Sequence, residues 1–132
     1  MKKYLLFLAI CLVMQTFPSK SMSGTIQKTG IFSNMRYHEE SGDLLGIEIF
    51  IFVADEGYYA LFQESEGGPG KPYLVPIVIS NETFNLTLPV SSLNISTLVY
   101  NCKIEAHRLV LKYQIGKEKR EIILKRKASY WQ

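Results

Sequence analysis

Turn-forming clusters punctuate the chain at short intervals, and they limit the length of any element that can form between them. They include Ser41-Gly42-Asp43, Asp55-Glu56-Gly57 and Gly116-Lys117-Glu118. The runs between the clusters are roughly 6 to 10 residues long and show no sustained apolar period of about 3.6 residues, which indicates β-strands. The spacing predicts eight strands, near residues 30–38, 44–54, 58–65, 72–79, 83–89, 95–104, 108–115 and 120–127.

Several of these runs alternate apolar and polar residues with a period of two. In 83–89 the polar residues between the apolar ones are Asn85 and Thr87, and in 108–115 they include Lys112 and Gln114. Because successive side chains of a strand point to opposite faces, each strand has one dry and one wet face. The residues predicted to share one interior are Phe84, Leu86, Leu88, Leu109, Leu111, Tyr113, Ile122 and Leu124.

Two runs, 47–53 and 73–79, are apolar on both faces. Either their outer faces are covered by another part of the chain, or they form a surface used for association, including association between copies of the protein. Pro76 lies within the second run. Because proline cannot donate a hydrogen bond to a ladder, it predicts a bulge or an interruption of pairing at that point.

Short connections between successive strands predict an antiparallel meander, because parallel pairing needs crossover segments of about a dozen residues or more. Closing the meander into an up-and-down barrel removes both sheet edges. The predicted fold is therefore all-β, an eight-stranded antiparallel meander closed into a small barrel, with a two-sheet β-sandwich as the alternative. A barrel of this size has an interior that side chains fill or that holds one small ligand.

The first 21 residues have the order of a removable export signal. Lys2 and Lys3 precede an apolar stretch at residues 4–14, and the small residues Ser19 and Ser21 follow it. The apolar stretch is shorter than the roughly 20 residues with which a helix spans a bilayer, so cleavage rather than anchoring is predicted.

Cleavage is predicted after Ser21, with Ser23 as the alternative site. Acylation at Cys11 fits less well, because Ile10 is bulky where lipoprotein signals carry a small residue. The protein is then expected to be exported, periplasmic or secreted, with a signal peptide at 1–21, a flexible segment at 22–29 and a barrel domain at 30–132. No membrane-spanning segment is expected in the mature chain.

The charge balance changes when the leader is removed. Lys2, Lys3 and Lys20 leave with it, so the 15 basic residues fall to 12 and balance the 12 acidic ones. The formal charge of +3 therefore belongs to the leader, and nucleic acid is not indicated as a partner. The length of 132 residues leaves room for one domain and excludes a multi-domain enzyme.

No pattern in the sequence indicates catalysis. His38 and His107 are the only histidines, and neither lies at zinc-ligand spacing. We therefore predict no catalytic residue, no metal site, no cofactor and no enzymatic activity. Without the leader Cys102 is the only cysteine, so it cannot form an internal disulfide, and a buried or half-buried structural thiol is expected.

The first predicted strand opens with Gly30, Phe32 and Asn34 at alternate positions. This opening resembles that of avidin-like and lipocalin-like barrels. The resemblance implies that Phe32 plugs the barrel under a basic residue of the last strand, here Arg126, and that Asn34 matches a ligand-contacting residue of the avidin group. Biotin binding is not implied, because the single tryptophan, Trp131, cannot form the tryptophan cage that grips biotin.

A broader similarity relates the chain to small exported bacterial proteins of unknown function. It depends on Ser33-Asn34-Met35 near the start of the domain and on Leu124-Lys125-Arg126-Lys127 and Ser129-Tyr130-Trp131-Gln132 at the end. This similarity implies no mechanism.

A candidate ligand site follows from the first strand. If Phe32 points inward, alternation places Asn34 and Arg36 inward as well. A buried arginine needs a carboxylate or an anionic ligand, and Glu48 on the neighbouring strand is the internal candidate. The predicted site is therefore Asn34 and Arg36, with Glu48 or Tyr59 nearby. The opposite register leaves Asn34 and Arg36 in water and turns inward Ile31, Met35 and Tyr37.

Two functional classes are open. The first is an exported, non-enzymatic binding module that holds a small ligand in or at the mouth of the barrel. The second is an envelope protein-interaction module, such as a lysozyme-inhibitor-like barrel. A polar cavity at Asn34 and Arg36 favours the first class, whereas a filled interior with an apolar outer patch favours the second.

Overall fold

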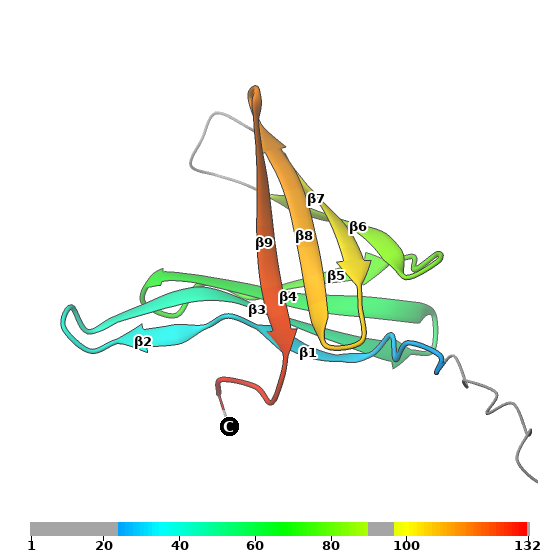
Figure 1. The fold of residues 1–132 in the computed structure, drawn as a ribbon, viewed down its shortest axis with the longest axis horizontal. Coiled ribbons are helices and arrows are strands. Elements are labelled where there is room, and N and C mark those ends of the chain that lie inside the picture. The colour runs from blue at the N-terminus through cyan, green and yellow to red at the C-terminus, as the bar shows by residue number, and fades with distance from the viewer. Residues whose placement is uncertain (1–23, 90–96, 132) are drawn as a thin grey trace, which may run out of the picture.

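The computed structural model describes residues 24–89 and 97–131, which form an all-β domain (Figure 1). The described residues contain no helix. The strands are β1 (Gly30–Ser33), β2 (Arg36–His38), β3 (Asp43–Ala54), β4 (Gly57–Gly67), β5 (Tyr73–Ile77), β6 (Thr83–Pro89), β7 (Thr97–Ile104), β8 (Arg108–Ile115) and β9 (Glu118–Arg126). The all-β prediction is confirmed. The predicted leader, its cleavage sites and Cys11 lie outside the described residues.

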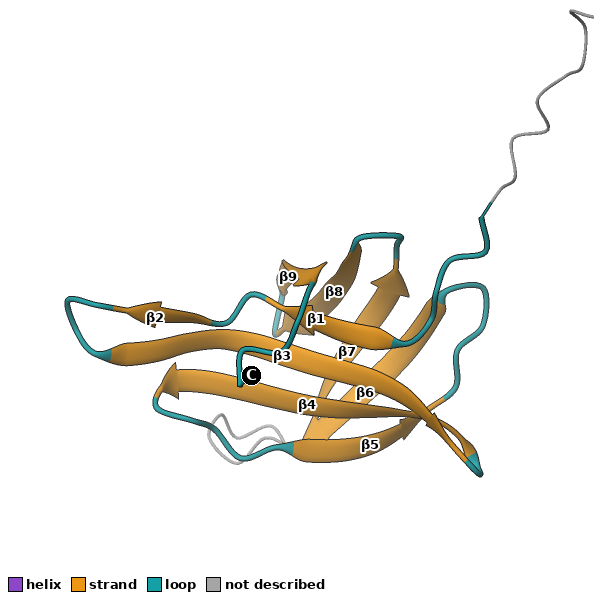
Figure 2. Cartoon of the chain, turned by 90° about the horizontal axis from the view of Figure 1, so that it is seen from below, coloured by secondary structure: helices purple, strands orange, loops and turns teal. Residues whose placement is uncertain are grey.

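The strands pair antiparallel in the order β5-β4-β3-β1-β9-β8-β7-β6, with β2 also paired to β3. Because β1 pairs with both β3 and β9, it joins the first and last parts of the chain. Figure 2 shows the result as two layers, β1–β5 and β6–β9. The free ends of the sheet, β5 and β6, are neighbours in sequence and in space. The predicted meander is confirmed, and the sheet is nearly closed into a barrel.

The interior is filled by one apolar cluster drawn from both layers. Sixteen buried residues form it, and others pack against it partly buried. The predicted interior residues all belong to the cluster or pack against it: Phe84, Leu86, Leu88, Leu109, Leu111, Tyr113, Ile122 and Leu124. The period-two alternation therefore assigned the inner face of β6, β8 and β9 correctly.

The predicted strand 30–38 is two strands, so the domain has nine strands rather than eight. The chain steps aside after Ser33, where the Asn34 side-chain oxygen accepts a hydrogen bond from the Ile47 N–H at 2.7 Å. The step passes close to β3, where a Cβ on Gly46 would lie 2.9 Å from the Cα of Met35. As a result the alternation is lost, and Phe32 and Met35 are both buried.

Pro76 does not form the predicted bulge. It lies opposite Tyr59 in an uninterrupted register between β4 and β5. The strand β5 is at the edge of the sheet, which is where proline is tolerated. On the open side of β5 the described residues form no ladder with β6, and only an isolated bridge joins Ser80 of the connection to Thr83 at the start of β6. Proline, which has no backbone N–H to donate, is therefore compatible with this unpaired edge.

Arg126 covers Phe32, which confirms the contact expected between these two residues. The guanidinium carbon lies 4.4 Å from the centroid of the Phe32 ring, which is fully buried. Arg126 also donates hydrogen bonds to the carbonyl oxygens of Gln27 and Thr29, both at 2.6 Å, and of Ala106 at 3.0 Å. One side chain thus ties the segment before β1 to β9 and to the β7–β8 turn.

Cys102 is buried on the inner face of β7, as expected of a structural thiol. Burial raises the pKa of its thiol to about 12, so almost no thiolate exists at neutral pH. We expect iodoacetamide to alkylate Cys102 at least roughly 100-fold more slowly in the folded protein than in denaturant. Peptide mapping by mass spectrometry measures both rates, and equal rates would show that the thiol is accessible.

Candidate functional site

The structure brings together two of the four predicted site residues. Asn34 and Arg36 are exposed and line a shallow hollow of about 330 Å³ with Leu45 and Gly46. The inward placement of Asn34 and Arg36 with Phe32 is wrong, because the strand ends at Ser33 and restarts at Arg36. The Asn34 oxygen is already engaged by the Ile47 N–H.

Glu48 is buried, but it does not pair with Arg36. The C-terminal segment lies over its carboxylate, which accepts hydrogen bonds from the Ser129 hydroxyl and, at 2.8 Å, from the Tyr130 N–H. Arg36 lies opposite Leu45 on β3 and forms no salt bridge within the described residues. The predicted internal pair is therefore wrong. The C-terminal segment, rather than Arg36, supplies the hydrogen-bond donors to the Glu48 carboxylate.

Tyr59 lies apart from the other three residues. It is opposite Phe52 in the β3–β4 ladder, and the two rings stack with centroids 6.0 Å apart. Its hydroxyl donates to Glu56 at 3.4 Å. Phe52 is four positions from Glu48, or about 13 Å along the strand. The four residues therefore do not form one site.

The different surroundings of Arg36 and Glu48 give a paired prediction. Arg36→Leu is expected to change the free energy of unfolding by less than about 0.5 kcal/mol, as at other exposed positions. Glu48→Gln should lower it by about 1 to 2 kcal/mol, because one of two charge-assisted hydrogen bonds loses its acceptor. Urea denaturation measures both. A larger loss of unfolding free energy for Arg36→Leu would indicate that Arg36 and Glu48 form a buried pair after all.

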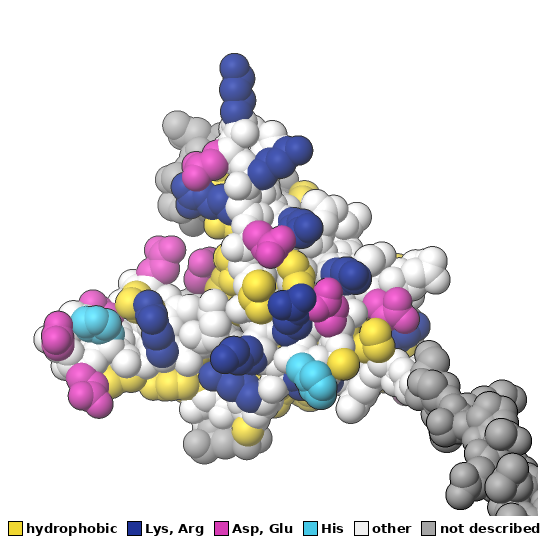
Figure 3. Space-filling view, viewed as in Figure 1, with side chains coloured by type: hydrophobic (Ala, Val, Ile, Leu, Met, Phe, Trp, Pro, Cys, Tyr) yellow, Lys and Arg dark blue, Asp and Glu magenta, His cyan; other side chains and the backbone are white. Residues whose placement is uncertain are grey.

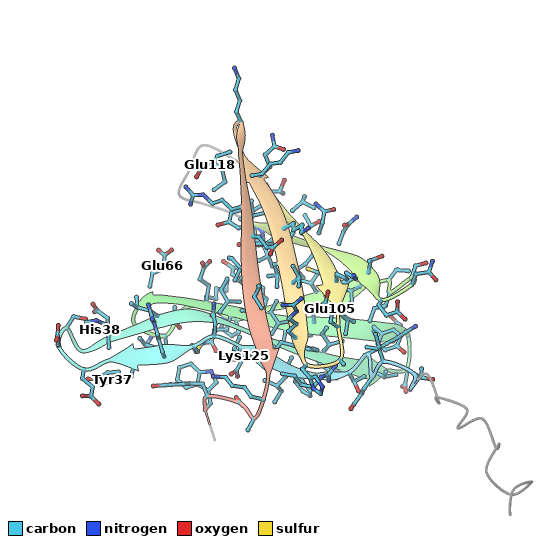
Figure 4. All side chains as sticks on the ribbon, in the orientation of Figure 1. Tyr37, His38, Glu66, Glu105, Glu118 and Lys125 are labelled. Carbon is cyan, nitrogen blue, oxygen red and sulfur yellow. The ribbon has the colours of Figure 1, made fainter. Side chains whose placement is uncertain are left out.

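Two acidic side chains near the end of β4, Glu64 and Glu66, lie close to the aromatic ring of Tyr100. Figure 4 shows Glu66 at the end of β4 and Glu118 at the start of β9, while Tyr37 and His38 lie on β2. Partial loss of hydration, and then the charge of Glu66, raises the pKa of Glu64 above its ordinary value. Burial, and then Glu64, raises the pKa of Tyr100 as well. A further negative charge near Glu64 and Tyr100 would therefore be unfavourable.

The raised pKa of Glu64 predicts the direction of a pH effect. The folded state holds the Glu64 proton more tightly than the unfolded chain, so its contribution to stability is lost as pH rises through the raised pKa. Glu64→Gln should therefore raise the melting temperature at pH 7 relative to the natural protein. Glu118→Gln is the control: Glu118 is exposed and Arg120 holds its pKa below the ordinary value, so that variant should not raise the melting temperature. Equal shifts would refute the assignment.

The outer face of β3, β4 and β5 is apolar and partly exposed. Cross-strand partners place Phe50 beside Leu61 and Leu61 beside Leu74, and Phe52 beside Tyr59 and Tyr59 beside Pro76. We call these six residues, Phe50, Phe52, Tyr59, Leu61, Leu74 and Pro76, the outer apolar face. It combines outward residues of the two runs that are apolar on both faces with two outward residues of β4. It is exposed, except for Phe52 and Tyr59, which are half-buried.

A second surface feature lies on the outer face of β6 to β9. It is a groove of about 680 Å³. Polar and charged side chains line most of it, including Asn85, Asn101, Lys103, Arg108 and Lys112. We call it the outer polar groove. In Figure 3 lysine, arginine and glutamate side chains are interspersed over β8 and β9.

No protein family, no curated protein and no solved structure matches the chain. Within residues 24–89 and 97–131, no three histidine, cysteine, aspartate or glutamate side chains lie close enough together to hold a metal ion. The same residues include no helix long and apolar enough to cross a membrane. The candidate sites therefore rest on geometry and chemistry alone, and the two outer surfaces are the strongest of them.

Proposed function

We propose that this protein is an exported, non-enzymatic interaction module that binds another protein through the outer apolar face. The observation that carries this proposal is the exposure of neighbouring large apolar side chains on one sheet face. Phe50 is 40% exposed, Leu61 38% and Leu74 59%. Contiguous exposed apolar surface of this kind on a soluble domain marks an interaction site.

The character of the face favours a protein as the partner. None of its six residues is charged, whereas Asp55 and Glu56 lie in the β3–β4 turn and Lys71 lies before β5. Apolar and aromatic residues at the centre with charges at the rim is the usual composition of protein interfaces. The partner surface is expected to be apolar and uncharged at its centre.

A ligand inside the barrel, the other function that the sequence raised, has less support. Buried side chains fill the interior in one cluster. Asn34 and Arg36, the residues expected to hold such a ligand, are exposed and border only a shallow hollow. The filled interior and the outer apolar face together favour protein interaction.

Site-specific photo-cross-linking in the cells that make the protein tests this proposal. A photoreactive phenylalanine analogue replaces Leu61 or Leu74, and the control carries it at Val99, an outward residue of β7 that is 43% exposed. We expect one discrete protein adduct from positions 61 and 74 and none from position 99. Leu74→Asp should remove the adduct formed at position 61.

Two results would overturn the proposal. Absence of an adduct at both apolar positions would show that the face is not used. An adduct of twice the mass of the chain would identify a second copy, rather than a different protein, as the occupant. N-terminal sequencing of the same material shows whether residues 1–21 are removed, which tests the export part of the proposal.

A further inference from the structure

We propose that the outer polar groove binds an acidic oligosaccharide, a chain of hydroxyl-rich sugar units that carry carboxylates at intervals. The groove is separate from the outer apolar face, since β6 to β9 and the β5–β6 connection line it and none of the six residues of that face does. The proposal is therefore independent of the proposed function. It rests on the order of side chains across the sheet, on their charge and on an apolar patch in the groove lining.

A row of hydrogen-bonding groups crosses four strands in register. Asn85 lies opposite Asn101, Asn101 opposite Lys112, and Lys112 opposite Glu121. All four side chains are exposed and line the groove. Each amide offers both donors and an acceptor, lysine offers donors, and glutamate offers acceptors. Because a sugar hydroxyl is both donor and acceptor, this mixed row fits hydroxyl-rich ligands.

The charge of the groove is only weakly positive. Its lining holds Lys103, Arg108 and Lys112 against Glu105 and Glu121, which gives a net charge of 3 − 2 = +1. Both glutamates form salt bridges with these basic residues. Glu105 lies 3.5 Å from the Lys103 ammonium and contacts Arg108, and Glu121 lies 3.4 Å from the Lys112 ammonium. Such a surface fits a ligand with sparse negative charge better than a polyphosphate.

Further positive charge lies beside the groove on the same face. Lys125 is opposite Arg108, and Lys119 is opposite Gln114, so both are outward residues of β9. In Figure 4 Glu105 stands at the β7–β8 turn and Lys125 towards the end of β9. A chain that continues out of the groove across β9 therefore meets lysines, which favours an oligosaccharide with a carboxylate in successive units.

Val110 gives the groove an apolar patch. Val110 is 8% exposed and lies opposite Ile123 in the β8–β9 ladder. Aliphatic side chains contact the C–H groups of a sugar ring. The lining contains one aromatic residue, Phe84, whose side chain is buried in the core. Without an exposed aromatic ring there is no platform on which nucleic-acid bases can stack. The groove volume of about 680 Å³ lies within the range of ligand sites.

A titration followed by NMR tests the proposal with defined probes. Tri-galacturonate is added to the ¹⁵N-labelled protein, with maltotriose as the neutral sugar of equal length and a short single-stranded DNA as the polyphosphate. We expect saturable shifts with tri-galacturonate at the backbone amides of Asn85, Asn101 and Lys112. Maltotriose should bind at least roughly tenfold more weakly, because it lacks charge-assisted hydrogen bonds.

Variants locate the site. Lys112→Gln and Asn101→Ala should each weaken tri-galacturonate binding, the former by roughly tenfold. Lys71→Gln removes the same charge on the β4–β5 connection and should leave the affinity unchanged. The ¹⁵N spectrum of each variant shows whether the fold is kept. Leu74→Asp, which disables the outer apolar face, should also leave binding unchanged, so failures of the two proposals are distinguishable.

Several outcomes would overturn the inference. Shifts that do not saturate, or that spread over lysines on all faces, would show unspecific attraction. Equal affinities for maltotriose and tri-galacturonate would show that the ligand carboxylates do not contribute to binding. Tighter binding of the DNA than of tri-galacturonate would show that the groove prefers a polyphosphate to an acidic sugar. An affinity unaffected by both Lys112→Gln and Asn101→Ala would place any site elsewhere.

Discussion

Replacing Leu111 by alanine is expected to lower the free energy of unfolding by about 2 to 5 kcal/mol. Leu111 is fully buried on the inner face of β8, between Cys102 of β7 and Ile122 of β9 in the ladder. Truncation removes apolar contacts and leaves a cavity in the one cluster that both layers share. The midpoint of urea denaturation should fall accordingly, with an unchanged slope.

Ile123→Ala is the matched control. Ile123 is an aliphatic residue on the neighbouring strand, but it faces outward and is 44% exposed. Its truncation should change stability by no more than about 0.5 kcal/mol. An unchanged midpoint for Leu111→Ala, or equal losses in the two variants, would show that the inner and outer faces of this layer are assigned wrongly.

The inner face of the second layer could be predicted because its strands are wet on one side. In β6, Phe84, Leu86 and Leu88 are buried and the residues between them are exposed, so burial follows the period of two without exception. In β3 both faces are apolar, and Ile49 and Phe50 look equivalent in the sequence. Only the structure shows that Ile49 is buried and Phe50 is exposed.

The start of the domain could not be predicted by alternation. The assumption behind the Asn34 and Arg36 site was an unbroken strand, but the Asn34 side chain accepts a hydrogen bond from β3 and the chain steps aside. Asparagine side chains readily form hydrogen bonds in place of backbone groups. A signal for the step was therefore present in the residue type, although not in the apolar pattern.

The burial of Glu48 depends on long-range contact. Its partners, Ser129 and Tyr130, are more than 80 residues away and follow the last strand. No periodicity links such positions. Likewise the row formed by Asn85, Asn101 and Lys112 depends on the register of β6, β7 and β8, which the sequence does not state. The outer polar groove therefore could not be predicted from the sequence, whereas the outer apolar face was anticipated by the two runs that are apolar on both faces.

Replacing Arg126 by leucine is expected to lower the free energy of unfolding by about 2 to 4 kcal/mol, because the side chain joins β9 to the segment before β1 and to the β7–β8 turn. It packs on Phe32 and donates hydrogen bonds to Gln27, Thr29 and Ala106. Leucine keeps some contact with the ring but leaves three carbonyl oxygens without their donors. Denaturation measures the loss, and hydrogen exchange should rise first at residues 26–32.

Lys125→Leu is the control, since Lys125 adjoins Arg126 in β9 but points outward and is exposed. It should change stability by less than about 0.5 kcal/mol. Arg126→Lys keeps the charge but cannot reach three carbonyls in a planar fork, so it should recover only part of the loss. Full recovery with lysine would show that charge, rather than the fork, is what matters at this position.

Gly30 tests the same contact from the opposite side. Its φ is +133°, and a Cβ there would lie 2.5 Å from the Arg126 Nη1, so Gly30→Ala must displace the guanidinium as well as strain the backbone. If the Arg126 guanidinium holds the start of β1 against β9, the double variant Gly30→Ala with Arg126→Leu should be less destabilised than the sum of the single variants. Strict additivity would mean that the two residues act separately and that β1 is held in the sheet by its ladders alone.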